Sequence, residues 1–179
     1  MARGPERKVT NMTIDGTEIT LDISGLGIVF HSPQAAKHIA EGSDYLTSNY
    51  MTDQQVQSHI QKGSIVGFGT GSPGIYVLKF HSGYPDDTYL QKCEFKLRLG
   101  LECRGGLVCF RDLYELMDWR ADCPITQTLK LDDGFYHVTL CSTRPASGVL
   151  GDNQEIQFYL HKLEEFPRLT KEGVPTLCM

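Results

Sequence analysis

The stretch "KCEFKLRLGLEC", residues 92–103, alternates apolar and polar side chains along almost its whole length. Its apolar positions are Cys93, Phe95, Leu97, Leu99, Leu101 and Cys103. A period of two places alternate side chains on opposite faces of a β-strand. The stretch therefore predicts a long strand with one buried face and one solvent-facing face, as is usual in antiparallel sheets. Both cysteines fall on the buried face, which favours a structural role for them.

The same period recurs in shorter runs along the chain. These runs are residues 19–23, 27–30, 64–69, 75–81, 106–110, 126–131, 135–141 and 156–160. Eight or nine short strands separated by turn residues are typical of a sandwich or barrel. We predict an all-β fold, a mainly antiparallel, jelly-roll-like β-sandwich with two or three short helices inserted after the first strands.

Residue pairs with capping chemistry mark the starts of the expected helices. The pairs are Ser32–Pro33, Thr52–Gln55 and Asp112–Glu115. Proline is favoured at the first helical position, and a Thr or Asp followed three residues later by Gln or Glu forms a capping box. Gly42 and Gly63 are the expected ends of the first two helices.

Length and composition indicate one ordinary globular unit. The 179 residues are 40% hydrophobic and 22% charged, with no repeat and no linker, so we expect a single domain over 1–179 with a flexible tail at 1–10. No secretory signal or membrane-spanning run is apparent, and the six cysteines lack metal-ligand spacing. We therefore expect a cytoplasmic protein with reduced thiols and no membrane association.

Residues 67–74, "GFGTGSPG", match the pattern G-x-G-x-x-G of nucleotide-binding loops. That mechanism needs a helix after the last glycine, but "IYVLKF" follows, and Pro73 removes one backbone N–H. We interpret the stretch as a β-hairpin whose turn needs positive φ at Gly71 and Gly74.

No recognisable catalytic, metal-binding or cofactor-binding motif occurs in the chain. The serine elbow, the zinc-protease motif and the P-loop are absent, and no two histidines are spaced as a metal-ligand pair. The alternation along the strand turns Cys141 away from the core, which makes it the best thiol candidate, although an ordinary surface cysteine is the favoured interpretation. We predict a protein that is not an enzyme and has no metal, cofactor or catalytic residue.

The formal net charge of −5 argues against a nucleic-acid partner, which would require a concentrated positive field. The same charge is explained by solubility alone and does not identify a partner. The oligomeric state is left open.

The stretch "DDGFYHV", residues 132–138, resembles the tyrosine corner of immunoglobulin-like sandwiches. In that motif a tyrosine hydroxyl caps the backbone at a turn between strands. Asp132, Gly134 and Tyr136 match it, whereas Val138 stands where the cysteine would be. We expect Tyr136, Val138 and Leu140 to point into the core.

From "LRLGLECRGGLVCFRDLYELMDW" through "LKLDDGFYHVTLCSTRPASGVLGDN", the chain resembles a family of uncharacterised bacterial β-sandwich proteins distantly similar to the competence nuclease inhibitor ComJ. The resemblance spans roughly residues 18–165. It implies a small bacterial protein that works by binding another protein, such as a toxin or nuclease. No inhibitory residues can be matched position by position.

Three functions are compatible with the sequence. The first is a non-enzymatic protein-binding module, such as an inhibitor or immunity partner. The second is a carbohydrate-binding or small-ligand-binding sandwich that stacks sugars on aromatic rings. The aromatic candidates are Tyr45, Tyr50, Tyr84, Tyr89 and Trp119. The third is an enzyme without a recognisable motif.

The region 142–153, "STRPASGVLGDN", predicts an irregular loop between two strands. Its length exceeds that of a tight hairpin, and such loops often carry function. An ion pair between Arg144 and Asp152 would fasten its base, and Val149 and Leu150 would form an exposed apolar tip that docks a partner.

If the tip is exposed, replacing both Val149 and Leu150 by serine leaves the melting temperature nearly unchanged. Thermal unfolding followed by circular dichroism measures this. A large drop in melting temperature would instead mean that the loop packs into the core.

Overall fold

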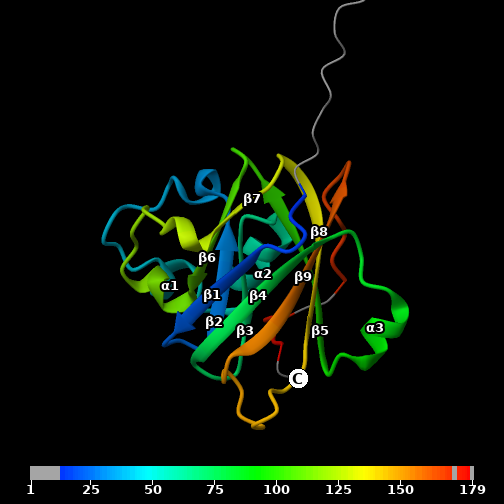
Figure 1. Cartoon of the computed structure of the whole chain (residues 1–179). Coiled ribbons are helices and arrows are strands. Elements are labelled where there is room, and N and C mark those ends of the chain that lie inside the picture. The colour runs from blue at the N-terminus through cyan, green and yellow to red at the C-terminus, as the bar shows by residue number, and fades with distance from the viewer. Residues whose placement is uncertain (1–12, 171–172, 178–179) are drawn as a thin grey trace, which may run out of the picture.

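The protein is a β-sandwich of two sheets (Figure 1), seen in a computed structural model that describes residues 13–170 and 173–177. The five-stranded sheet has the order β1 (Glu18–Ile23), β4 (Gly74–Ser82), β9 (Gln154–Leu163), β8 (Gly134–Ser142) and β5 (Phe95–Cys103). The four-stranded sheet has the order β3 (Ile65–Gly69), β2 (Gly27–His31), β6 (Leu107–Asp112) and β7 (Thr128–Lys130). The paired strands are antiparallel except β4 and β9, which run parallel. The predicted all-β sandwich is confirmed, and the predicted tail at 1–10 lies outside the described residues.

Short helices connect the strands. The α-helices are α1 (Tyr45–Asn49), α2 (Asp53–Lys62) and α3 (Asp87–Lys92), and the 3₁₀-helices are η1 (Pro33–Ala36), η2 (Leu113–Met117) and η3 (Ile125–Gln127). The capping boxes at the starts of α2 and η2 are both formed as predicted. Gly63 ends α2 with a φ of +61°, a conformation that suits glycine. The three helices η1, α1 and α2 lie between β2 and β3, so the expected insertion of helices after the first strands is also confirmed.

Five phenylalanines join the two sheets at the centre of the molecule. They are Phe30, Phe68 and Phe110 from the four-stranded sheet and Phe80 and Phe158 from the five-stranded sheet. The ring of Phe158 lies 5.8 Å from Phe30 and 5.6 Å from Phe110, measured between centroids, and both contacts are edge-to-face. Edge-to-face aromatic contacts add to the free energy of burial, which is itself about 2–3 kcal/mol for a buried phenylalanine. This cluster holds the sandwich together.

The tyrosine corner predicted at β8 is present. The Tyr136 hydroxyl donates a hydrogen bond of 2.7 Å to the backbone carbonyl of Asp132. Gly134, two residues before the tyrosine, has a φ of +149°. Tyr136, Val138 and Leu140 are all buried in the core, as expected.

A second copy of this arrangement, which the sequence analysis missed, starts β4. The Tyr76 hydroxyl donates a hydrogen bond of 2.7 Å to the carbonyl of Ser72, again four residues earlier. Gly74 stands two residues before the tyrosine and has a φ of +141°. A Cβ at Gly74 would overlap the backbone of Gly151, so only glycine fits there. The pattern Gly-x-Tyr therefore begins two long strands of the five-stranded sheet, β4 and β8.

The prediction of a β-hairpin at residues 67–74 is wrong, although the predicted positive φ values at Gly71 and Gly74 are confirmed. The two strands have the predicted positions, but β3 pairs with β2 and β4 pairs with β1 and β9. The glycine-rich stretch is therefore a crossover from one sheet to the other. A period-two pattern specifies which face of a strand is buried but not which strand pairs with it.

The long strand predicted at 92–103 begins later than expected. Residues 87–92 form α3, and Cys93 ends that helix rather than extending β5. The helix covers the outer face of the five-stranded sheet beside Cys141, so that Cys141 is fully buried. Strand parity placed Cys141 on the correct face, but the expectation of an accessible thiol is wrong because a helix covers it.

The tyrosine corner generates a stability prediction. Tyr136→Phe removes the hydroxyl and leaves the Asp132 carbonyl without its partner, so the free energy of unfolding should fall by about 1 kcal/mol. Urea denaturation followed by circular dichroism measures the change. Tyr114→Phe is the control, since it removes a hydroxyl from a side chain that is 44% exposed. Equal stabilities of Tyr136→Phe and the parent would refute a stabilising corner.

Candidate protein-interaction surface

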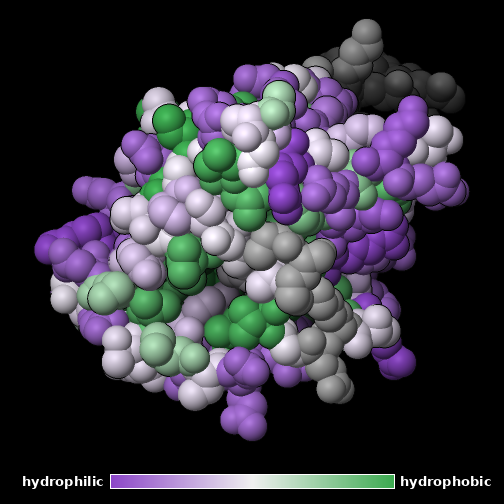
Figure 2. Space-filling model, turned by 90° about the horizontal axis from the view of Figure 1, so that it is seen from below, coloured by the Kyte–Doolittle hydropathy of each residue, from purple (hydrophilic) through white to green (hydrophobic). Residues whose placement is uncertain are grey.

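One end of the sandwich exposes large apolar side chains (Figure 2). We use the name apolar end for the loops on this side together with four of their exposed apolar side chains, Leu26, Tyr114, Met117 and Val149, which are between 44% and 60% exposed. Soluble proteins seldom expose several large apolar residues together unless the surface meets a partner. The residues come from the turn between β1 and β2, from η2 and from the β8–β9 loop.

Backbone hydrogen bonds join the loops of the apolar end. The amide of Thr70, in the crossover between β3 and β4, donates to the carbonyl of Leu26 at 2.8 Å. The amide of Ile75, at the other end of that crossover, donates to the carbonyl of Gly151 at 2.7 Å. The crossover therefore links the turn that carries Leu26 to the loop that carries Val149.

The carboxylate of Asp112 fixes the turn before Leu26. One of its oxygens accepts hydrogen bonds from the Ser24 amide at 2.8 Å, from the Ser24 hydroxyl at 3.1 Å and from the Gly25 amide at 3.2 Å. The other oxygen accepts from the Tyr114 amide at 3.0 Å. A Cβ at Gly25 would come within 3.0 Å of the Tyr114 ring, so the ring lies directly on this turn. One side chain therefore positions both Leu26 and Tyr114.

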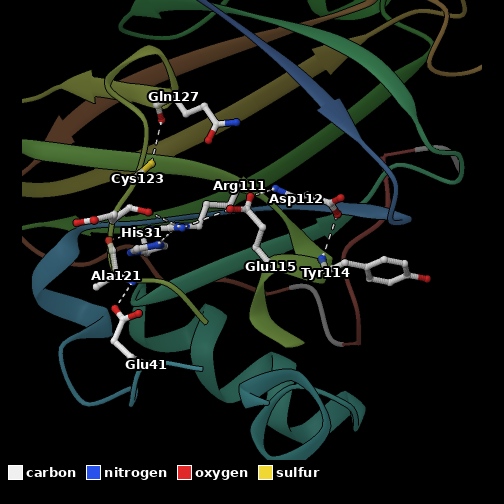
Figure 3. Close-up of polar contacts among 10 residues, drawn as sticks. His31, Glu41, Arg111, Asp112, Tyr114, Glu115, Ala121, Cys123 and Gln127 are labelled. Carbon is white, nitrogen blue, oxygen red and sulfur yellow. Dashed lines mark hydrogen bonds and ion pairs between the residues drawn. The ribbon is translucent and has the colours of Figure 1, made fainter. Parts of the chain in front are cut away.

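The neighbouring residue, Arg111, is buried beneath the same segment (Figure 3). Its Nε donates to Nε2 of His31 at 3.2 Å, and one terminal nitrogen donates to Glu115 at 3.4 Å. The guanidinium also lies over the Trp119 ring, 4.6 Å from the centroid. Removing any partner of a buried cation is costly because the charge is then left without compensation.

The guanidinium also holds the chain after η2. It donates to the carbonyl of Ala121 at 3.1 Å and to that of Asp122 at 3.4 Å. The Ala121 amide donates in turn to Glu41 at 2.6 Å. Through these contacts Arg111 attaches residues 113–122 to the outer face of the four-stranded sheet. It thereby supports η2, which carries two of the four apolar residues.

The two residues predicted at the tip of the β8–β9 loop have different environments in the structure. Val149 is 60% exposed and belongs to the apolar end, whereas Leu150 is partly buried and packs against the core. The expected ion pair at the loop base is replaced, because Arg144 approaches Glu94 at 3.8 Å rather than Asp152. Partner binding by Val149 and Leu150 stays a prediction. Leu26, Tyr114 and Met117 were missed by the sequence analysis, since isolated apolar residues in turns carry no periodic signal.

The aromatic residues considered for sugar stacking do not form a platform. Tyr45, Tyr50 and Trp119 are buried in the core. Only Tyr84 is exposed, and Tyr89 is partly exposed on α3. A sugar-binding face would need several accessible rings, so these residues give that hypothesis little support.

Within the described residues, no group of three His, Cys, Asp or Glu side chains is arranged to hold a metal ion. Burial raises the pKa of the Cys141 thiol to about 12, which keeps it protonated and unreactive at neutral pH. A hollow of about 590 Å³ opens at the end opposite the apolar end, with Lys62, Arg104 and Phe166 in its lining. No helix in the described part of the chain has the length and apolar character needed to cross a bilayer.

Comparison with known proteins finds a similarity of fold but none of sequence. No family model matches the sequence, and no curated protein sequence matches it either. The structure is similar to the crystal structure of ComJ from Bacillus subtilis, described as an inhibitor of the DNA-degrading activity of NucA. The TM-score is 0.53 at 12% identity, over 86% of this chain and all of ComJ. A structure described as crocagin biosynthetic gene J gives a TM-score of 0.49 at 14% identity, over 79% of this chain and 94% of that chain.

The buried histidine generates a prediction about pH. His31 donates from Nδ1 to the Ser32 carbonyl and accepts from Arg111 at Nε2, so it is neutral in the folded protein. Burial, with a further contribution from Arg111, lowers the pKa of His31 to about 4, whereas an unfolded histidine has a pKa near 6.5. The unfolded state binds more protons between these values. Stability should therefore fall by up to about 3 kcal/mol as the pH drops from about 6.5 to about 4.

Urea denaturation at several pH values tests this contribution. His31→Gln should lose the part of the pH dependence that lies in this window, and the surface variant His161→Gln serves as control. The same pH dependence in His31→Gln and the parent would contradict the assignment.

Proposed function

We propose that this protein is a non-enzymatic protein-binding module that inhibits or neutralises a nuclease or toxin. The apolar end is its binding surface, with Leu26, Tyr114 and Val149 as the main contacts. On this proposal the protein acts in the bacterial cytoplasm, a reducing compartment that suits its free cysteines at 93, 103, 109, 123 and 141.

The observation that carries the proposal is the combination of an exposed apolar surface with a firm support beneath it. Asp112 fastens the Leu26 turn to η2, and Arg111 fastens η2 and the following chain to the four-stranded sheet. A surface that is ordered before binding loses little conformational entropy when a partner docks. Surfaces of this kind serve in protein–protein recognition, where aromatic and other large apolar side chains act as anchors.

The likeness to ComJ supports the choice of partner class. It extends over the whole of ComJ, whose described role is inhibition of a DNA-degrading enzyme. At 12% identity the likeness concerns the fold, and function resides in sites rather than folds. The nuclease-inhibitor role is therefore proposed for this chain and depends on the apolar end.

A photo-crosslinking experiment tests the proposal. A photoreactive amino acid is placed at Leu26 in the source cells, the crosslinked protein is identified by mass spectrometry, and the purified pair is measured by calorimetry. We expect a stoichiometric complex in which the partner's nuclease or toxic activity is inhibited. Leu26→Glu should weaken the complex by about tenfold or more, because it places a charge against a desolvated contact.

Ile125→Glu is the matched control, since Ile125 is 84% exposed and lies on η3, outside the apolar end. It should leave both affinity and inhibition unchanged, and both variants should keep the parent's melting temperature. A partner that binds Leu26→Glu as tightly as the parent would exclude the apolar end. A crosslinked partner without nuclease or toxin activity would exclude the inhibitor role.

A further inference from the structure

The outer face of the five-stranded sheet holds a cationic hollow of about 330 Å³. Its charged and titratable lining residues, taken from the described part of the chain, are Lys96, Arg98, Arg168 and His137, and no acidic residue is among them. Lys96 and Arg98 flank the buried Leu97 on β5, so both side chains leave the sheet on its solvent side. The hollow lies on a different surface from the apolar end.

Three elements bring these cations together. His137 on β8 lies directly opposite Gly100 on β5 in the antiparallel ladder. The chain after β9 passes the same glycine, where a Cβ would meet the side chains of Phe166 and Pro167. The next residue along, Arg168, therefore lies against the edge of β5. The absence of a side chain at Gly100 allows this close approach.

Among the described residues, the positive charges in the hollow have no carboxylate partner. Of the six arginines within the described residues, Arg104, Arg111, Arg120 and Arg144 each form an ion pair within 4 Å. The two that form none there, Arg98 and Arg168, both line this hollow, and Lys96 forms none either. Like charges gathered without counter-charges produce a focused positive field that attracts an anion. The net charge of −5 describes the whole chain and not this face.

An exposed aromatic ring borders the hollow. The Tyr84 ring is stacked on His161 at 4.3 Å with an interplanar angle of 24°, and the Arg98 guanidinium lies 5.5 Å from its centroid. The Tyr84 hydroxyl is 3.0 Å from Nδ1 of His137. Tyr84 is 44% exposed, so a flat ring is held in place beside the cations and remains accessible to a ligand.

A buried hydroxyl lies next to the cations. Thr139 stands between Arg98 on β5 and Tyr159 on β9 in the ladder and is only 1% exposed. Its Oγ1 has no hydrogen-bond partner in the part of the chain that the structure describes, which is unusual for a buried polar atom. Thr139 lines a second hollow of about 490 Å³ that shares Lys96 and Arg98 with the first and has one acidic residue, Asp87, in its lining.

We propose that this face of the five-stranded sheet binds a nucleotide, with the phosphate on Arg98, Arg168 and Lys96 and the base against the ring of Tyr84. Guanidinium groups match phosphate oxygens in geometry and charge, and bases stack on exposed aromatic side chains of sheets. An acidic protein segment would use the cations but not the exposed ring. The nucleotide is either free or one unit of a single-stranded nucleic acid, and the chemistry of the contact is the same.

Binding measurements with defined probes test the proposal on the full chain. The probes are fluorescein-labelled oligo(dT) of twelve nucleotides, thymidine 5′-monophosphate, inorganic phosphate and poly-L-glutamate, measured by fluorescence anisotropy or calorimetry at low and moderate salt. Arg98→Gln and Arg168→Gln should each weaken binding of the nucleotide probes by about tenfold. Tyr84→Leu should weaken the same probes by about fivefold or more and leave inorganic phosphate unaffected.

Arg120→Gln is the matched control, because Arg120 is exposed and ion-paired away from the hollow. It should bind like the parent, and all variants should keep the parent's melting temperature. Oligo(dT) binding that is far tighter than monophosphate binding and falls steeply with salt supports a single strand as the source. Equal affinity for both probes supports a free nucleotide.

Three outcomes would overturn the proposal. The first is no binding of either nucleotide probe at millimolar concentration. The second is unchanged affinity in Arg98→Gln and Arg168→Gln. The third is poly-L-glutamate binding as tightly as oligo(dT) with no effect of Tyr84→Leu, which would assign the face to an acidic protein segment instead.

Discussion

The contact between phenylalanine rings across the two sheets determines which residues of the strands face the core and which face outward. Phe30 and Phe110 lie opposite each other on β2 and β6 and stack at 5.6 Å, and both meet Phe158 of the other sheet. Because successive residues of a strand point to opposite faces, the residues after them, His31 and Arg111, must leave the sheet on its outer side. A shift of the register by one residue would expose the rings and drive a guanidinium into the core.

The same register explains why the two outer faces differ. On the four-stranded sheet the outward cation is covered by the chain that follows it, so Arg111 is satisfied from within the molecule. On the five-stranded sheet the outward cations Lys96 and Arg98 lie on β5, and α3 covers the neighbouring part of that face instead. The outward cation of the four-stranded sheet therefore supports the loops that cover it, whereas those of the five-stranded sheet face the solvent. An average charge over the whole chain conceals this difference.

Contacts between residues close in sequence could be predicted from the sequence, whereas contacts between distant residues could not. The capping boxes of α2 and η2 and the tyrosine corner involve residues within four positions of each other, so the sequence alone was sufficient to predict them. The crossover at Gly71, the cover over Cys141 and the Arg144–Glu94 contact depend on distant residues. The same holds for the candidate site: exposure of Val149 followed from its loop, but the contribution of Leu26 and Tyr114 depends on Asp112, which is far away in sequence.

The parallel pairing of β4 with β9 has a consequence for how the chain reaches this fold. Tyr76 pairs with Gln154, so one side of β4 has no strand partner until residues 154–163 have been synthesised. During translation β1 and β4 can already pair, which leaves a long open edge on the nascent sheet. Pairings between residues so far apart in sequence form slowly, because a large loop must close first. Completion of the five-stranded sheet therefore requires β9, and the growing chain is most exposed to mispairing just before β9 emerges.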